Sequence, residues 1–338
     1  MSERVYVQTN DAERNEVIAF DRSGDGQLTL LGRYETGGSG TGKPHLASQS
    51  SVVLSDDGAW LLVANAGSDE LSLFAVEPDG LRLADRIASG GSGPTSVAVR
   101  SELVYALNNG TPSISGFYLA DGGLRPLERS TRPLSAGADP AQIAFSPDGR
   151  TLVVTERGTS SISAFAIDER GYAGGPETIP SAGATPYGFD FADGAVVVTE
   201  AFGGEIGKAA ASSYSLAAPG GLAPVSESVA DTRSEVCWAV ATRDGRFVYV
   251  TNFGDGTISS YAVGEGGSLE LADAVAASTR LGEPGIRDEA LSRDGRFLYA
   301  IDADAQRVFG WSVGDDGRLE LVGEVGGVPA TVAGLAAS

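Results

Sequence analysis

The sequence is poor in the residues from which many functional sites are built. Its 338 residues include one cysteine, Cys237, one histidine, His45, and two lysines, Lys43 and Lys208. A single cysteine excludes an intramolecular disulfide and a multi-thiolate metal site. A single histidine excludes a metal centre with two or more histidine ligands. We therefore expect no metal ion, and nothing in the sequence points to a cofactor.

Long apolar runs are also missing. No stretch of about 18 apolar residues is present to span a bilayer, so we expect no membrane insertion. Residues 1–10 resemble a strand and lack the apolar core and cleavage site of a signal peptide. The simplest predicted location is the cytoplasm.

Positive charge is scarce. The chain carries 45 acidic residues against 24 basic ones, for a formal net charge of −21. Such a surface repels phosphate backbones and anionic membranes, so nucleic acid is not an expected partner. Solubility or a salt-rich habitat accounts for the acidity without a charged partner.

An aromatic residue recurs in a constant local frame with a period of about 40–50 residues, which is typical of β-propellers. Most examples lie in short alternating segments such as SISAFAI at 161–167 and TISSYAV at 257–263. Core packing between blades is the expected role of these aromatics. The seven are Phe20, Phe74, Phe117, Phe165, Tyr214, Tyr261 and Trp311.

Each unit contains four strand-like segments separated by Gly- and Pro-containing turns. The chain begins with the second strand of a unit, around residues 5–7, and ends with a surplus segment at 330–336 that resembles an innermost strand. Pairing these two segments would close the ring and remove open sheet edges. The predicted fold is all-β: one domain over residues 1–338, a seven-bladed propeller of four-stranded antiparallel blades.

The residues that end the second strand of each unit are polar. Asn65, Asn108 and Asn252 lie there, and asparagine is common in turns. Glu156 and Glu200 occupy the same position, and turn preference does not explain glutamate. Two carboxylates that converge on a central funnel would suit general acid–base catalysis. We therefore predict catalytic roles for Glu156 and Glu200.

Arginines gather in the loops expected on the same face. Five are predicted near one mouth, and Arg233 and Arg287 are the candidate substrate-binding residues among them. The five are Arg157, next to Glu156, and Arg132, Arg233, Arg280 and Arg287 in the loops between blades. Guanidinium groups bind carboxylate or phosphate in a bidentate manner. Ion pairs with nearby acids are the alternative for each arginine taken singly. As a cluster, they predict a small anionic ligand.

Three further residues are candidate ligand contacts. Gln142 and Trp238 occupy the innermost-strand position nearest the funnel, where Trp238 could stack on a ligand or simply pack. His45 lies in a loop that should reach the same face. Cys237 follows apolar residues and is expected to be a buried, unreactive thiol.

The recurring phrases SPDGR (146–150), VTNFG (250–254) and ISAFAI (162–167) resemble those of the seven-bladed lactonase-like propellers. That family includes bacterial 6-phosphogluconolactonases and fungal carboxymuconate lactonizing enzymes. The resemblance implies a ligand funnel and metal-independent lactone hydrolysis or formation. Family members commonly carry a histidine on an innermost strand, whereas this chain has Ser96, Gln142 and Gly188 at the corresponding positions.

The leading hypothesis is a lactonase or lactonizing enzyme for a small carboxylated or phosphorylated substrate. Glu156 or Glu200 would transfer the proton, with Arg157 beside them. Arginines at the mouth would hold the anion, while asparagines orient it. The missing histidine motivates an alternative, a non-catalytic propeller that binds a small molecule or a protein at its funnel. A purely structural scaffold is the third possibility.

Overall fold

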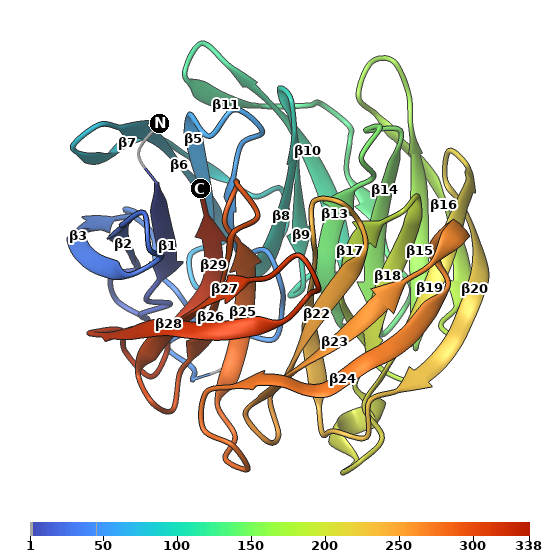
Figure 1. The fold of residues 1–338 in the computed structure, drawn as a ribbon. Helices are drawn as coiled ribbons and strands as arrows, with labels where there is room; N and C mark the ends of the chain where they lie inside the picture. The colour runs from blue at the N-terminus through green and yellow to red at the C-terminus, as the bar shows by residue number, and fades with distance from the viewer. Residues whose placement is uncertain (1–2, 45) are drawn as a thin grey trace.

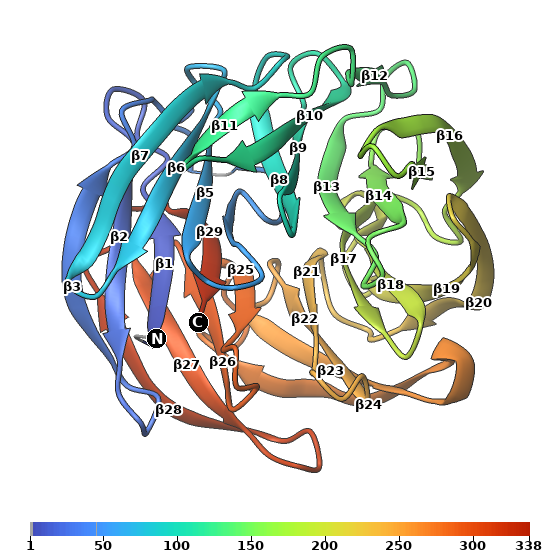
Figure 2. The same ribbon diagram turned by 90° about the horizontal axis from the view of Figure 1, so that it is seen from above.

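The chain forms seven antiparallel sheets arranged in a ring around a central axis (Figures 1 and 2). The computed structural model describes residues 3–44 and 46–338, with only the backbone for residues 217 and 218. Six sheets have four strands, and in the seventh the outermost strand is split into two pieces. This is the predicted seven-bladed β-propeller.

Strands at the same depth in each blade share a pattern of burial. The innermost strands are β29 (Ala333–Ala337), β4 (Val52–Leu54), β8 (Pro94–Arg100), β13 (Pro140–Phe145), β17 (Pro186–Ala192), β21 (Val236–Ala241) and β25 (Ile286–Leu291). The second strands are β1 (Arg4–Gln8), β5 (Trp60–Asn65), β9 (Leu103–Asn108), β14 (Thr151–Glu156), β18 (Ala195–Glu200), β22 (Phe247–Asn252) and β26 (Phe297–Asp302). These second strands are almost wholly buried because neighbouring blades cover both of their faces.

The outer half of each blade is more polar. The third strands are β2 (Glu16–Arg22), β6 (Glu70–Glu77), β10 (Ser113–Ala120), β15 (Ser161–Ile167), β19 (Ala210–Ala218), β23 (Thr257–Val263) and β27 (Arg307–Val313). The outermost strands are β3 (Leu28–Glu35), β7 (Gly80–Ala88), β11 (Gly123–Pro126) with β12 (Arg132–Pro133), β16 (Ala173–Pro180), β20 (Gly221–Ala230), β24 (Leu269–Ser278) and β28 (Leu319–Gly326). Two short 3-10 segments, η1 (Phe202–Gly204) and η2 (Glu265–Gly267), complete the description.

The recurring aromatics all lie on third strands, and each is at most 2% exposed. They pack in apolar clusters, most of which combine residues of two neighbouring blades. Burial of each side chain contributes roughly 1.5–3 kcal/mol of hydrophobic stabilisation. The predicted core-packing role is confirmed.

The ring closes through the two ends of the described chain. Strand β29 pairs antiparallel with β1, so that Tyr6 lies opposite Ala336 and Val7 opposite Leu335. The predicted closing segment was 330–336, but the strand begins at Ala333. Residues before it form a turn in which the Val332 amide donates a hydrogen bond to the Pro329 carbonyl (3.1 Å).

The antiparallel order gives the ring two different faces. Turns from innermost to second strands share one face, which we call the turn face. Loops from second to third strands, and from one blade to the next, share the opposite face, which we call the mouth face. Among the described residues, no helix is long and apolar enough to cross a membrane.

Candidate functional site on the mouth face

Glu156, the first predicted catalytic residue, lies inside its own blade. Its side chain is completely buried at the end of β14. The carboxylate accepts hydrogen bonds from the hydroxyls of Ser163 (2.6 Å) and Thr159 (3.0 Å) in the same blade. These contacts join the second strand to the third strand and to the loop between them.

Glu200 has the same position in the next blade and is equally buried. Its carboxylate accepts hydrogen bonds from the Gly183 amide (2.7 Å) and from the hydroxyls of Ser212 and Ser228. The two glutamates thus belong to separate blades, and each already has several donors. Bracing of the blade is a sufficient reason for a carboxylate at this position.

The three asparagines at the same position also form hydrogen bonds beside their strands, although Asn252 Oδ1 has no partner among the described residues. All three side chains are fully buried. The hydrogen bonds are Asn65 Nδ2 to Ser72 Oγ (2.8 Å), Ser89 Oγ to Asn108 Oδ1 (2.7 Å) and Asn252 Nδ2 to Ser259 Oγ (2.8 Å). The recurrence of polar residues at the ends of second strands therefore has a structural explanation.

A different group of side chains gathers where innermost strands begin on the mouth face. Arg157 and Arg287 both lie within electrostatic range of Tyr187 and Cys237. The structure thus brings together two of the predicted arginines and the segment that holds Trp238. We call this group the mouth cluster: Arg157, Tyr187, Glu235, Cys237, Trp238, Phe253, Arg287 and Asp288.

Arg287 is the most unusual member of the mouth cluster. It is 4% exposed, and its Nε and Nη1 atoms have no hydrogen-bond partner among the described residues. The nearest carboxylate oxygen in an ion pair belongs to Asp304, at 3.9 Å. The guanidinium lies over the Phe253 ring at 5.3 Å, and burial lowers its pKa. An anion placed beside it would satisfy donors that the protein leaves unused.

Arg157 is better satisfied than Arg287. Its Nη2 lies 2.8 Å from Asp139 Oδ1, and its guanidinium lies 5.0 Å from the centre of the Tyr187 ring. The aromatic ring holds the planar guanidinium in one orientation. Arg157 can therefore add a second positive group at the mouth without the cost of an unpaired charge.

Two acids of the mouth cluster have raised pKa values. Burial raises the pKa of Asp288 to about 7, although the Gly334 amide donates a hydrogen bond to its Oδ2 (3.0 Å). Burial also raises the pKa of Glu235, and Arg287 partly opposes that shift. A carboxyl group that titrates closer to neutral pH is suited to proton transfer. Cys237 is buried and its pKa is raised by burial, as expected for an unreactive thiol.

Trp238 packs within the mouth cluster and is fully buried. Its Nε1 donates to the Ser48 carbonyl (2.8 Å), and its ring lies 5.4 Å from the Tyr187 ring. Gln142 instead joins two blades, because its Nε2 donates to the Phe189 carbonyl (3.0 Å) and its Oε1 accepts from the Phe189 amide.

The remaining predicted residues lie elsewhere or have other partners. Arg280 pairs with Asp302 (3.1 Å), as the ion-pair alternative expected. Arg132 donates to the backbone carbonyls of Arg129 and of Ala173, which lies on β16 of the neighbouring blade. Arg233 Nη2 lies 3.3 Å from the Thr232 hydroxyl. His45 lies outside the described residues.

Sequence reasoning missed Tyr187, Glu235 and Phe253 as members of the site. A signal for part of the cluster is present in the repeat itself. The equivalent position on successive innermost strands holds Thr95, Ala141, Tyr187, Cys237 and Arg287, which share neither size nor polarity. Two residues later, the corresponding residues are mostly buried and apolar: Val97, Ile143, Phe189 and Ala239.

The sequence matches the family model described as "Lactonase, 7-bladed beta-propeller" over residues 2–132, 101–202 and 225–335. The chain belongs to this lactonase family. No curated protein matches it. Within the described part of the chain, no group of three or more His, Cys, Asp or Glu residues is arranged to hold a metal ion.

Solved structures share the whole fold at low sequence identity. The periplasmic gluconolactonase of Pseudomonas aeruginosa is 17% identical, with a TM-score of 0.77 over 100% of this chain and 99% of that one. A putative 6-phosphogluconolactonase from Bacteroides fragilis is 17% identical, with a TM-score of 0.76 over 100% and 98%. Another, from Bacteroides uniformis, is 20% identical, with a TM-score of 0.74 over 98% and 99%. At these identities the likeness extends to the fold, and cytoplasmic location stays a prediction.

Proposed function

We propose that this lactonase-family protein hydrolyses or forms the lactone of a small substrate that carries a carboxylate or phosphate group. The observation that carries the proposal is Arg287 on the mouth face, a nearly buried guanidinium with two nitrogens that have no hydrogen-bond partner among the described residues. A substrate anion would accept hydrogen bonds from these nitrogens, and Arg157 would add a second positive charge nearby. The aromatic rings of Tyr187 and Phe253 hold the two guanidinium groups in place.

Proton transfer is assigned to Glu235. In hydrolysis, a base removes a proton from water as the water oxygen attacks the lactone carbonyl carbon. The ring carbon–oxygen bond then breaks, and the departing oxygen takes up a proton. Glu235 is partly exposed on the mouth face, has a raised pKa and lies within electrostatic range of Arg287. Glu156 and Glu200, which the sequence suggested for this role, already accept hydrogen bonds inside their blades.

The test is a hydrolysis assay with purified protein on a panel of γ- and δ-lactones with and without a carboxylate or phosphate. We expect activity on anionic lactones, unchanged after dialysis against a chelator. Arg287→Gln and Glu235→Gln should each remove most of it. A matched control is Arg307→Gln, which changes a surface arginine in an ion pair with Glu324. Equal rates for wild type and Arg287→Gln, or equal rates on neutral and anionic lactones, would contradict the proposal.

A second function is favoured by the missing innermost-strand histidine. Ser96, Gln142 and Gly188 stand at the positions where family members commonly carry it. A non-catalytic propeller would bind the same anion through Arg287 without turnover. Its signature is a rise in melting temperature with an anionic lactone or its hydroxy acid, absent in Arg287→Gln, while no lactone in the panel is consumed.

A further inference from the structure

The segment that leads into β4 reaches across the central axis of the ring. We call residues 46–50 the strap, and the short strand β4 begins just after it. The Gln49 amide donates a hydrogen bond to the Ala141 carbonyl on β13 (3.1 Å). The Ser48 carbonyl accepts one from Trp238 Nε1 on β21 (2.8 Å). The strap therefore joins the blade of β4 to two blades that are not its neighbours in the ring.

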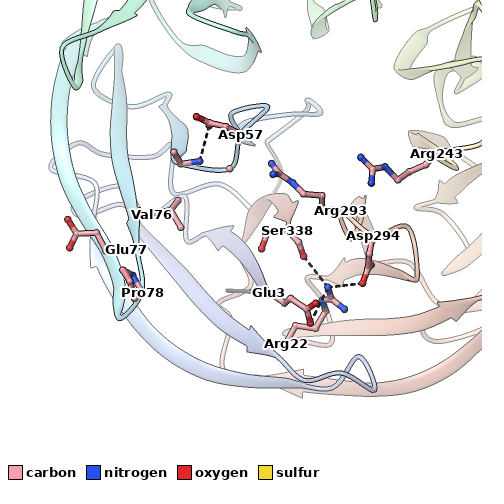
Figure 3. Close-up of a pocket in the computed structure, with 12 residues that line it drawn as sticks. Glu3, Arg22, Asp57, Val76, Glu77, Pro78, Arg243, Arg293, Asp294 and Ser338 are labelled. Atoms are coloured by element: carbon pink, nitrogen blue, oxygen red, sulfur yellow. Dashed lines mark hydrogen bonds and ion pairs between the residues drawn. The ribbon is translucent and has the colours of Figure 1, made fainter. Parts of the chain in front are cut away.

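The side chain of Gln49 makes the longest of these connections. Gln49 is 7% exposed. Its Nε2 donates to the Ala239 carbonyl (2.7 Å), and its Oε1 accepts a hydrogen bond from the Ala239 amide (3.0 Å). On the turn face, by contrast, Arg22 pairs with Asp294 of the adjacent blade at 3.2 Å (Figure 3). Gln49 instead bonds to the backbone of a blade across the ring.

Gly188 on β17 makes room for this side chain. On the two preceding innermost strands, the equivalent residue bonds to the next blade. Ser96 accepts a hydrogen bond from a backbone amide of β13, and Gln142 bonds to both the amide and the carbonyl of Phe189. Gly188 has no side chain for the next such contact, and a Cβ atom there would lie 2.2 Å from Gln49 Oε1. Gln49 thus supplies from across the axis the contact that Gly188 cannot make.

The strap forms the floor of the mouth. Toward the turn face, a cavity of about 340 Å³ lies along the innermost strands, and Gln49 is among its lining residues. On the mouth side, the buried Trp238 ring lies 5.4 Å from the Tyr187 ring. The guanidinium of Arg157 lies over that Tyr187 ring at 5.0 Å. A series of contacts therefore leads from the strap through Trp238 and Tyr187 to Arg157.

We propose that Gln49 is a positioning residue for the mouth cluster. It holds the strap against Ala239, and the strap fixes the Trp238 ring on which the Tyr187–Arg157 pair rests. This inference rests on the proposed function, because the substrate anion is what that pair would help to bind. Loss of the Gln49 side chain would leave the Ala239 amide and carbonyl unpaired and release the strap. A site residue misplaced by such a release loses affinity for its ligand.

Acrylamide quenching of tryptophan fluorescence tests this role without turnover. Gln49→Met keeps a side chain of similar length and removes both hydrogen bonds to Ala239. Trp238 is one of three tryptophans, and we expect its quenching constant to rise roughly twofold as the strap opens locally. Adding Trp238→Phe should abolish this rise. In the lactone assay, KM for an anionic lactone should rise about tenfold with little change in kcat.

Tyr105→Phe is the matched control, because it also removes two hydrogen bonds to the backbone of another blade. The Tyr105 hydroxyl donates to the Gly171 carbonyl (2.8 Å) and accepts from the Ala173 amide (2.9 Å), far from the strap along the repeat. This variant should lose stability as Gln49→Met does. Its tryptophan quenching and its KM should match those of wild type.

Unchanged quenching in Gln49→Met would overturn the proposal, as would a wild-type KM or equal changes in Tyr105→Phe. If wild type hydrolyses no lactone, the proposed function fails, and the quenching alone decides the role of Gln49. If Gln49→Met does not fold, Gln49→Glu takes its place. Glutamate keeps the acceptor for the Ala239 amide and loses the donor to the Ala239 carbonyl, so quenching should rise by a smaller amount. No rise in that variant would contradict the proposal.

Discussion

The ends of the second strands and the beginnings of the innermost strands both carry buried polar residues, but the two regions treat charge differently. Glu156 and Glu200 are fully buried and have donors within hydrogen-bond distance on several sides. Arg287 is almost as buried, yet two of its nitrogens have no partner among the described residues. A satisfied buried charge stabilises one conformation, whereas an unsatisfied one costs free energy that a ligand can recover.

The largest expected effect is on stability, at Glu200. Glu200→Ala removes a buried acceptor and leaves the Gly183 amide and the Ser212 and Ser228 hydroxyls without their partner. We expect the free energy of unfolding to fall by about 3 kcal/mol. Urea titration measures this loss. A change below about 1 kcal/mol would show that Glu200 does not stabilise its blade.

Arg287→Gln should act on activity instead. Loss of two charge-assisted hydrogen bonds to the substrate should lower kcat/KM on an anionic lactone by about 100-fold. The free energy of unfolding should stay the same or rise, because the variant removes a buried charge two of whose nitrogens have no hydrogen-bond partner among the described residues. Steady-state kinetics and urea titration on one preparation measure the activity and the stability. A loss of stability with unchanged kinetics would show that Arg287 supports the fold and does not bind the substrate.

Buried carboxyl groups near the innermost strands should make the stability of the protein depend on pH. Burial raises the pKa of Asp288 to about 7 and that of Asp190 to about 6, and it raises that of Glu289 well above its usual value. The folded protein therefore holds more protons than the unfolded chain near neutral pH. The stabilisation is complete below about pH 4 and is lost as the pH rises through 7.

We expect Asp288 alone to lower the free energy of unfolding by about 1 to 2 kcal/mol between pH 6 and pH 8, and Glu289 to add to this decrease. Asp288→Asn should flatten this dependence. Urea titrations at a series of pH values provide the measurement. Stability that stays constant over this interval would show that these carboxyl groups are already ionised in the folded protein at pH 6.

The smallest effect is expected at Arg157. Asp139 already accepts a hydrogen bond from its guanidinium, so less of its charge is available to a ligand. Arg157→Gln should lower kcat/KM by about five- to tenfold. A loss as large as that of Arg287→Gln would mean that the pairing with Asp139 does not limit its role.

The sequence predicted the fold well because the repeat encodes it. The aromatic on each third strand and the surplus C-terminal segment together determined the number of blades and the closure by β29. The start of that strand was missed by three residues, since a turn at 330–332 has no distinctive composition. The site residues were harder to predict than the fold. A polar residue at the end of a strand can face the funnel or the blade, and sequence does not distinguish these directions.

Ser163 and Ser212, which donate to Glu156 and Glu200, lie on third strands, but their pairing with the glutamates needed the register. Tyr187, Cys237 and Arg287 come from different blades, so no local motif joins them. Burial of Arg287 with two nitrogens that have no hydrogen-bond partner among the described residues is a property of the assembled ring alone.

The most direct test measures Arg287→Gln and Glu156→Gln side by side for kcat/KM on an anionic lactone and for free energy of unfolding. Both changes leave a polar side chain and remove one charge, and glutamine has the shape of glutamate but is shorter than arginine. We predict that Arg287→Gln loses activity and keeps its stability, while Glu156→Gln loses stability and keeps its activity at a temperature where it is folded. The reverse pattern would contradict the separation of bracing carboxylates from a ligand-binding arginine.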